Sequence, residues 1–149
     1  MTAAAIDRKT LADTVEARLR NQLPNVVGYQ GEAVNVPHTQ GGDGRVVPYW
    51  VLHVVPGGPT DQQDLGDTVV DLDWGFQITC AGGTVDDVQA LMSDVDAAVF
   101  RWRPIVTGLV CGPCKPPFGF TGVPIQMDRS VTPHRPFVPL QYVTRITKS

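Results

Sequence analysis

The fold of this chain is decided by residues 67–99, which read DTVVDLDWGFQITCAGGTVDDVQALMSDVDAAV. From Val70 to Cys80 apolar side chains alternate with polar ones, and this period of two predicts a strand with one buried face. After the small residues at 81–83, apolar residues recur every three or four positions, which predicts an amphipathic helix. Because neither apolar surface can be buried alone, we expect the helix to fold back onto the sheet.

The predicted core lies between this strand and this helix. Its expected members are Trp74, Phe76 and Ile78 from the strand and Val88, Leu91, Met92 and Val95 from the helix. Thr84 stands where a hydroxyl caps free N–H groups, and Asp86 and Asp87 follow beside the positive end of the helix. These residues predict that the helix begins directly after Thr84.

Length and composition predict a single domain with one hydrophobic core, and they argue against nucleic-acid and membrane partners. The chain has 149 residues, 42% of them hydrophobic, which predicts a single domain over residues 1–149. Its net charge is −3, and three lysines and nine arginines form no basic cluster of the kind that nucleic-acid binding needs. No apolar run approaches the roughly 20 residues that span a bilayer. The N-terminus lacks the apolar part of a signal peptide, so we expect a protein made and kept in the cytoplasm, without membrane contact.

The residues before the central stretch predict a second helix and further strands. Residues 4–23 carry apolar side chains four positions apart, and Pro24 ends this helix. Strands are expected at residues 26–27, 34–36 and 49–55. The polar loop at 56–66, PGGPTDQQDLG, then joins the last of these to the central strand as the enlarged tip of a hairpin.

Three more strands are expected after the central helix, at residues 105–110, 123–127 and 137–147. Residues 111–122 contain too much proline and glycine for regular structure. Pro139 predicts that the last strand lies at an edge or begins its pairing late. The order of elements predicts an α+β fold: a single domain with a mainly antiparallel sheet and two amphipathic helices packed on one face.

The sharpest chemical motif is Cys111-Gly-Pro-Cys114, which has the spacing of the thioredoxin redox motif. That chemistry needs the first cysteine at a helix N-terminus, where its pKa is lowered, but Pro116 and Pro117 follow here and prevent a helix. The pair also has zinc-ligand spacing, with Cys80, His38, His53 and His134 as further donors. A structural zinc site normally has two close pairs of ligands, and this chain has one. We expect a tight loop here. The alternative function is a small thiol-redox or zinc protein that uses Cys111 and Cys114.

Carboxylates are numerous, at Asp71, Asp73, Asp86, Asp87, Asp94 and Asp96. Acid–base catalysis needs two carboxylates that converge in a cleft, whereas these are divided between one sheet face and one helix. The chain also has no nucleophile elbow and no glycine-rich loop before a helix that would hold a phosphate. We therefore expect a protein without enzymatic activity, catalytic residues or cofactor.

The order of elements resembles that of the tail terminator, or tail completion, proteins of long-tailed bacteriophages. The residues that carry the resemblance are the strand Phe76-Gln77-Ile78-Thr79-Cys80, the small-residue break, the helix over 86–99 and the closing strand FVPLQYVTRIT. The resemblance implies a structural virion protein of the siphovirus tail or neck, assembled in the host cytoplasm. Another neck or minor tail component is the alternative among structural proteins.

The resemblance also implies a set of partners. Such proteins form a ring, expected to be a homo-hexamer, that caps the finished tail tube. The other face of the ring meets the head–tail connector or stopper protein, and DNA passes through the ring without specific binding. The partners expected here are therefore further copies of this chain, the tube protein and the connector.

Two groups of residues are candidates for these contacts. The sheet face opposite the helices is expected to meet neighbours or to line the ring channel, and it carries His53, Asp71, Asp73, Gln77 and Thr79. Acidic groups there would repel passing DNA phosphates. The polar loop is expected to order against a neighbour or the tube, and its candidate docking residues are Gly58, Thr60, Asp61, Gln62 and Gln63.

Overall fold

The structure is a computed structural model that describes residues 7–39, 44–54, 62–63, 70–119 and 122–148. Among these residues it contains two helices and seven strands. Their order is α1 (Arg8–Gln22), β1 (Val27–Gln30), β2 (Tyr49–Val54), β3 (Gln62–Gln63), β4 (Val70–Ala81), α2 (Val85–Val99), β5 (Leu109–Cys111), β6 (Gln126–Asp128) and β7 (Arg135–Lys148). Neither described helix has the length and apolar character needed to cross a bilayer.

The seven described strands form one sheet in the order β1-β2-β4-β7-β5, with β3 also paired to β4 and β6 to β7. Its centre is the long antiparallel pair β4 and β7, whose register runs from Asp71 opposite Thr147 to Ala81 opposite Phe137. β1 runs parallel to β2, and the other described pairings are antiparallel. The predicted α+β class with a mainly antiparallel sheet is therefore confirmed.

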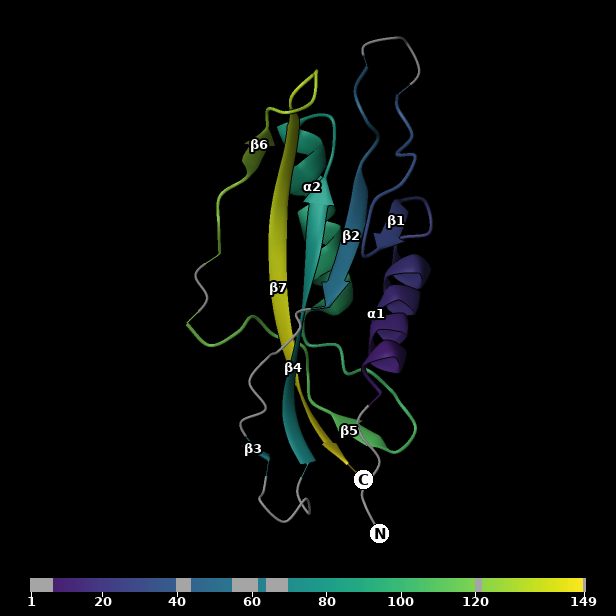
Figure 1. The fold of residues 1–149 in the computed structure, drawn as a ribbon, viewed down its shortest axis with the longest axis vertical. Helices are drawn as coiled ribbons and strands as arrows, with labels where there is room; N and C mark the ends of the chain where they lie inside the picture. Colours follow the sequence, from purple (N-terminus) through teal and green to yellow (C-terminus); the bar gives the residue numbers. More distant parts are fainter. Residues whose placement is uncertain (1–6, 40–43, 55–61, 64–69, 120–121, 149) are drawn as a thin grey trace.

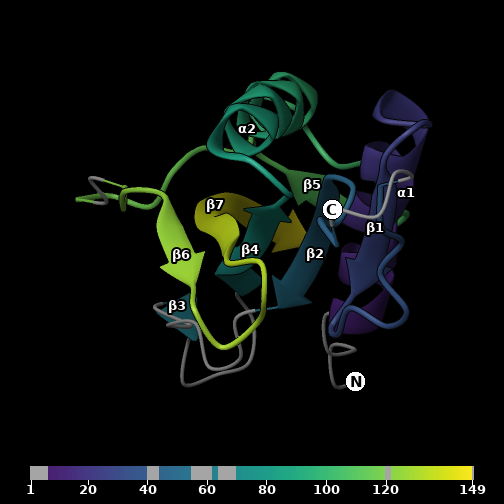
Figure 2. The ribbon, with the colours of Figure 1, turned by 90° about the horizontal axis from the view of Figure 1, so that it is seen from above.

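Both helices cover the same face of the sheet, as Figures 1 and 2 show. α1 contacts β1 and β2, whereas α2 contacts β4 and β7. The main core between the two layers includes Trp50, Leu52, Trp74, Phe76 and Ile78 from the sheet and Leu11, Val15, Leu19, Val88, Leu91 and Val95 from the helices. Met92 packs against its margin. The predicted packing of the central strand under the central helix is confirmed.

The helix boundaries follow from capping residues. Thr84 Oγ1 accepts a hydrogen bond from the Asp87 N–H over 3.1 Å, so α2 begins where its sequence predicts. α1 begins at Arg8, because the carboxylate of Asp7 accepts from the N–H groups of Lys9 and Thr10. Of the predicted helix over 4–23, residues 4–6 lie outside the described residues.

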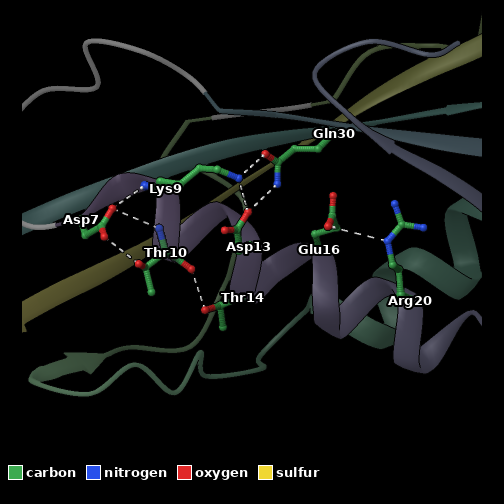
Figure 3. A network of polar contacts seen from close by, with 8 residues as sticks. All are labelled: Asp7, Lys9, Thr10, Asp13, Thr14, Glu16, Arg20 and Gln30. Atoms are coloured by element: carbon green, nitrogen blue, oxygen red, sulfur yellow. Dashed lines mark hydrogen bonds and ion pairs between the residues drawn. The ribbon is translucent and has the colours of Figure 1, made fainter.

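A polar network runs along the exposed side of α1 and connects it to β1 (Figure 3). Lys9 Nζ lies 2.6 Å from Asp13 Oδ1, and Gln30 Nε2 of β1 donates to the same oxygen over 3.2 Å. Hydrogen bonds from Thr10 hold the pKa of Asp7 below its ordinary value, and the bond from Lys9 does the same for Asp13. The polar groups on the exposed side of α1 are therefore paired with one another, and Gln30 links the helix to β1.

Two predicted short strands are wrong or displaced. Residues 34–36 form no strand, because Asn35 adopts a left-handed conformation with φ of 54°. Val36 instead packs in a second apolar cluster on the opposite face of the sheet, against Tyr49, Val51 and Ala81. The strand expected at 26–27 is β1, and its parallel pairing with β2 was not anticipated.

The late elements are shifted from their predicted places. The strands expected at 105–110 and 123–127 are the three-residue strands β5 and β6. Pairing of β7 with β4 already includes Phe137, so the late start expected from Pro139 is wrong. The alternative of an edge position is wrong too, because β5 and β6 pair with β7 on its other side. The Val143 N–H donates to the Lys115 carbonyl, away from β4, and Pro139 lies four residues earlier on the same side. Its missing N–H therefore faces the outer side of β7, in the stretch between the β6 pairing, which ends at Phe137, and the bridge of Val143 to Lys115.

Candidate functional site

The loop with Cys111 and Cys114 runs along the outer edge of β7. Cys111 ends β5 opposite Ile146, and the Cys114 N–H donates to the Trp102 carbonyl over 2.8 Å. Lys115 then exchanges two backbone hydrogen bonds with Val143. The chain after Cys114 is thus held in extended pairing, and the helix that thioredoxin chemistry requires does not follow.

Burial suppresses the reactivity of the cysteines. All three are free and buried. Burial raises the pKa of the Cys80 and Cys114 thiols from the ordinary value of 9.0 to about 12, and it also raises the pKa of Cys111. A redox cysteine needs a lowered pKa and access to its partner. The environment of Cys111 and Cys114 therefore gives no support to thiol exchange at neutral pH.

The candidate zinc donors lie apart. Cys80 is paired with Trp50 and shares the helix-covered face, whereas His53 lies opposite Gln77 on the other face. His134 Nδ1 lies 3.3 Å from the Arg129 guanidinium. Within the described ranges no three His, Cys, Asp or Glu side chains gather in a way that could hold a metal ion.

The predicted polar face is assembled by the sheet. His53, Asp73, Gln77 and Thr79 alternate with core residues, are half-buried and share the face away from the helices. Asp71 has the same parity and lies opposite Thr147, but its side chain lies outside the described part of the structure. The strand period was sufficient to place these residues on one face.

The charge of this face differs from the acidic surface that the sequence suggests. Arg145 lies directly opposite Asp73, with 3.6 Å between Nη1 and Oδ1. The two side chains are 51% and 37% exposed, so solvent screens the pair and its contribution to stability is small. Gln77 Nε2 donates to Thr79 Oγ1 over 3.3 Å. The described part of the face is therefore polar and mixed in charge.

The docking-loop candidates are only partly described. Gln62 and Gln63 form β3, opposite Asp71 and Val70 of β4. Gly58, Thr60 and Asp61 lie outside the described residues. The hairpin formed by β2 and β4 is confirmed by their antiparallel register.

Comparisons with known proteins bear on the fold alone. No family of known proteins matches this chain, and no curated protein matches it. One solved chain, which carries no descriptive name, aligns with 95% of this chain and 96% of its own length. The TM-score is 0.57 and the sequence identity is 14%. The arrangement of helices and strands therefore recurs in another protein at low sequence identity.

The sequence did not predict two exposed apolar side chains and one surface hollow. Phe118 is 108% exposed and Ile105 is 89% exposed, both in segments outside the helices and strands. A hollow of about 350 Å³ also lies between the C-terminal end of α1 and the C-terminal part of α2. The run Lys115-Pro-Pro-Phe-Gly was a signal for the exposure of Phe118, because a phenylalanine between prolines and glycine has few neighbours to cover it. The hollow has no local signal.

Proposed function

We propose that this protein is a tail-terminator-like ring subunit, which caps a phage tail tube and joins it to the head connector. The observation that supports this role best is the one-sided covering of the sheet. Two helices cover one face and bury most of its side chains, while the half-buried polar residues His53, Asp73, Gln77 and Thr79 lie on the other. A subunit of this kind has an uncovered sheet face that is free for assembly and an apolar layer that stabilises its own fold.

The covered and open faces suggest an orientation in the ring. The apolar cluster of Tyr49, Val51 and Ala81 is shielded at the β1–β2 side, so the open polar area lies over β4 and β7. We assign this area to the channel side and the helices to the outer side. Paired charges such as Asp73 and Arg145 present little net charge to DNA phosphates, which suits passage without binding.

Electron microscopy of particles that lack the protein tests this function. Loss of a terminator is expected to give overlong or headless tails, and supply of the wild-type chain is expected to restore normal particles. Normal tails of normal length without the protein would contradict the proposal. A map of the assembled particle tests the orientation, which is wrong if Asp73 lies on the outer wall and the helices line the channel.

A further inference from the structure

The segment between β5 and β6 presents an exposed aromatic side chain. Phe118 is 108% exposed, which means that its ring has essentially no cover from the rest of the described chain. Pro116 and Pro117 precede it, and their rings fix φ at two successive backbone positions. The segment projects beyond the sheet on the side away from α1 (Figures 1 and 2). We call residues 115–119 the Phe118 knob.

The hollow between the helices has room for such a side chain, and its lining is partly apolar and partly polar. Leu23, Pro24, Val26 and Ala97 form its apolar part, and Asp94 stands among its polar residues. Its volume is about 350 Å³, and it is open to solvent on one side. We call this site the α1–α2 hollow. It lies on the helix side of the molecule, whereas the knob leaves the sheet at its β6 edge.

The charges around the two features are opposite in sign. Lys115 begins the knob, and Arg101 is hydrogen-bonded through its backbone to Cys114 beside it. α2 carries four aspartates and no basic residue, and Asp94 is the one that lines the hollow. Among the described residues neither Lys115 nor Asp94 is part of an ion pair. Arg18, which approaches Ala98, is already occupied by the Ala98 carbonyl and the Trp102 ring.

We propose that Phe118 of one copy inserts into the α1–α2 hollow of the next copy, with Lys115 facing Asp94. Because knob and hollow are different surfaces, the contact is heterologous, and its repetition closes into a ring or continues as a filament. The inference rests on the proposed function in one respect, since it supplies the subunit contact of the ring. A hydrophobic residue that is left uncovered in the monomer thereby becomes buried in the assembly.

Sedimentation of the purified full-length chain tests the contact directly. Phe118→Ala is expected to weaken self-association about tenfold or more, whereas Ile105→Ala removes a comparably exposed apolar side chain elsewhere and should leave it unchanged. Ala97→Trp fills the hollow and should have the same effect as Phe118→Ala. Its control is Ala90→Trp, at an exposed position of α2 that does not line the hollow.

Mixing and charge exchange make the test specific to this pairing. Phe118→Ala keeps the hollow and Ala97→Trp keeps the knob, so their mixture should form dimers that neither variant forms alone. Lys115→Glu and Asp94→Lys should each weaken association, and the double variant should recover it. A wild-type chain that stays monomeric at high concentration, or rings that are insensitive to Phe118→Ala and Ala97→Trp, would overturn the inference.

The outcomes separate this inference from the proposed function. Rings that depend on Phe118 but fail to cap tail tubes would support the contact and contradict the terminator role. Rings that persist in Phe118→Ala and still restore normal tails would support the role and contradict the contact.

Discussion

The phenol of Tyr142 donates a hydrogen bond to Oδ1 of Asp96 over 2.9 Å, which joins the middle of β7 to α2. Tyr142 is buried, and its ring stacks on Phe76 with 5.7 Å between centroids. The same residue thus contacts the neighbouring strand through its ring and the covering helix through its hydroxyl. Burial, with the bond to Asp96, raises the pKa of Tyr142 above its ordinary value, so the phenol keeps its proton at neutral pH.

Replacement of Tyr142 by Phe is expected to lower the free energy of unfolding by about 1 kcal/mol, because it removes the hydrogen bond and retains the ring. Urea denaturation measures the change. Asp96→Asn is the matched control: it keeps an acceptor for the hydroxyl and should cost less. Equal stability of Tyr142→Phe and the wild type would show that the bond contributes nothing.

Replacement of Phe76 by Ala is expected to cost about 3–5 kcal/mol, since the side chain is completely buried between the sheet and α2. Phe118→Ala removes the same side chain from an exposed position and should change the stability of the monomer by less than about 0.5 kcal/mol. Thermal or urea unfolding below the concentration of self-association compares the two. A similar cost for both would contradict the assigned register of β4.

Gly28→Ala is expected to destabilise the fold by about 1–3 kcal/mol or more, through overpacking. A Cβ at this position would lie 2.0 Å from ring atoms of Trp50, which is fully buried and has no room to move away. Gly112→Ala is the control, because a Cβ there meets its nearest atom at 3.6 Å. If both variants were equally stable, the packing of Trp50 on β1 would have to be different.

Stability is expected to fall as pH rises above about 9. In the folded chain the pKa of the Cys80 and Cys114 thiols is raised from 9.0 to about 12. Between these two pH values the unfolded chain loses the thiol protons while the folded chain keeps them, so the free energy of unfolding falls. Each thiol contributes a slope of up to about 1.4 kcal/mol per pH unit. Unfolding measured from pH 8 to 11 should show a shallower decline in the Cys80→Ala, Cys114→Ala double variant. An unchanged slope would mean that the thiols are accessible in the folded protein.

Replacement of Cys111 and Cys114 by Ser is expected to leave assembly intact, because the loop is held by backbone hydrogen bonds to Trp102, Val143 and Arg145. Electron microscopy of the variant and its metal content measure the outcome. Loss of assembly together with loss of one bound zinc per chain would favour the metal-site alternative. Loss of a thiol-reductase activity would favour the redox alternative.

The sequence by itself determined the long central strand, the central helix and the face on which their residues lie. The alternation in β4 and the three- and four-residue steps in α2 are local patterns, and the cap at Thr84 acts within a few residues. The grouping of His53, Asp73, Gln77 and Thr79 also followed, because the direction of a side chain depends on parity along a strand.

Tertiary structure decided which of these elements meet. Asp73 faces Arg145 only because of the β4–β7 register, and Gly28 is required only because Trp50 of a parallel neighbour lies against it. The left-handed turn at Asn35 converted an apolar run into a coil that covers Tyr49 and Val51. The Phe118 knob and the α1–α2 hollow likewise depend on how distant segments are placed. Strand pairing and packing across many residues depend on the whole set of competing contacts, and a local pattern carries no information about them.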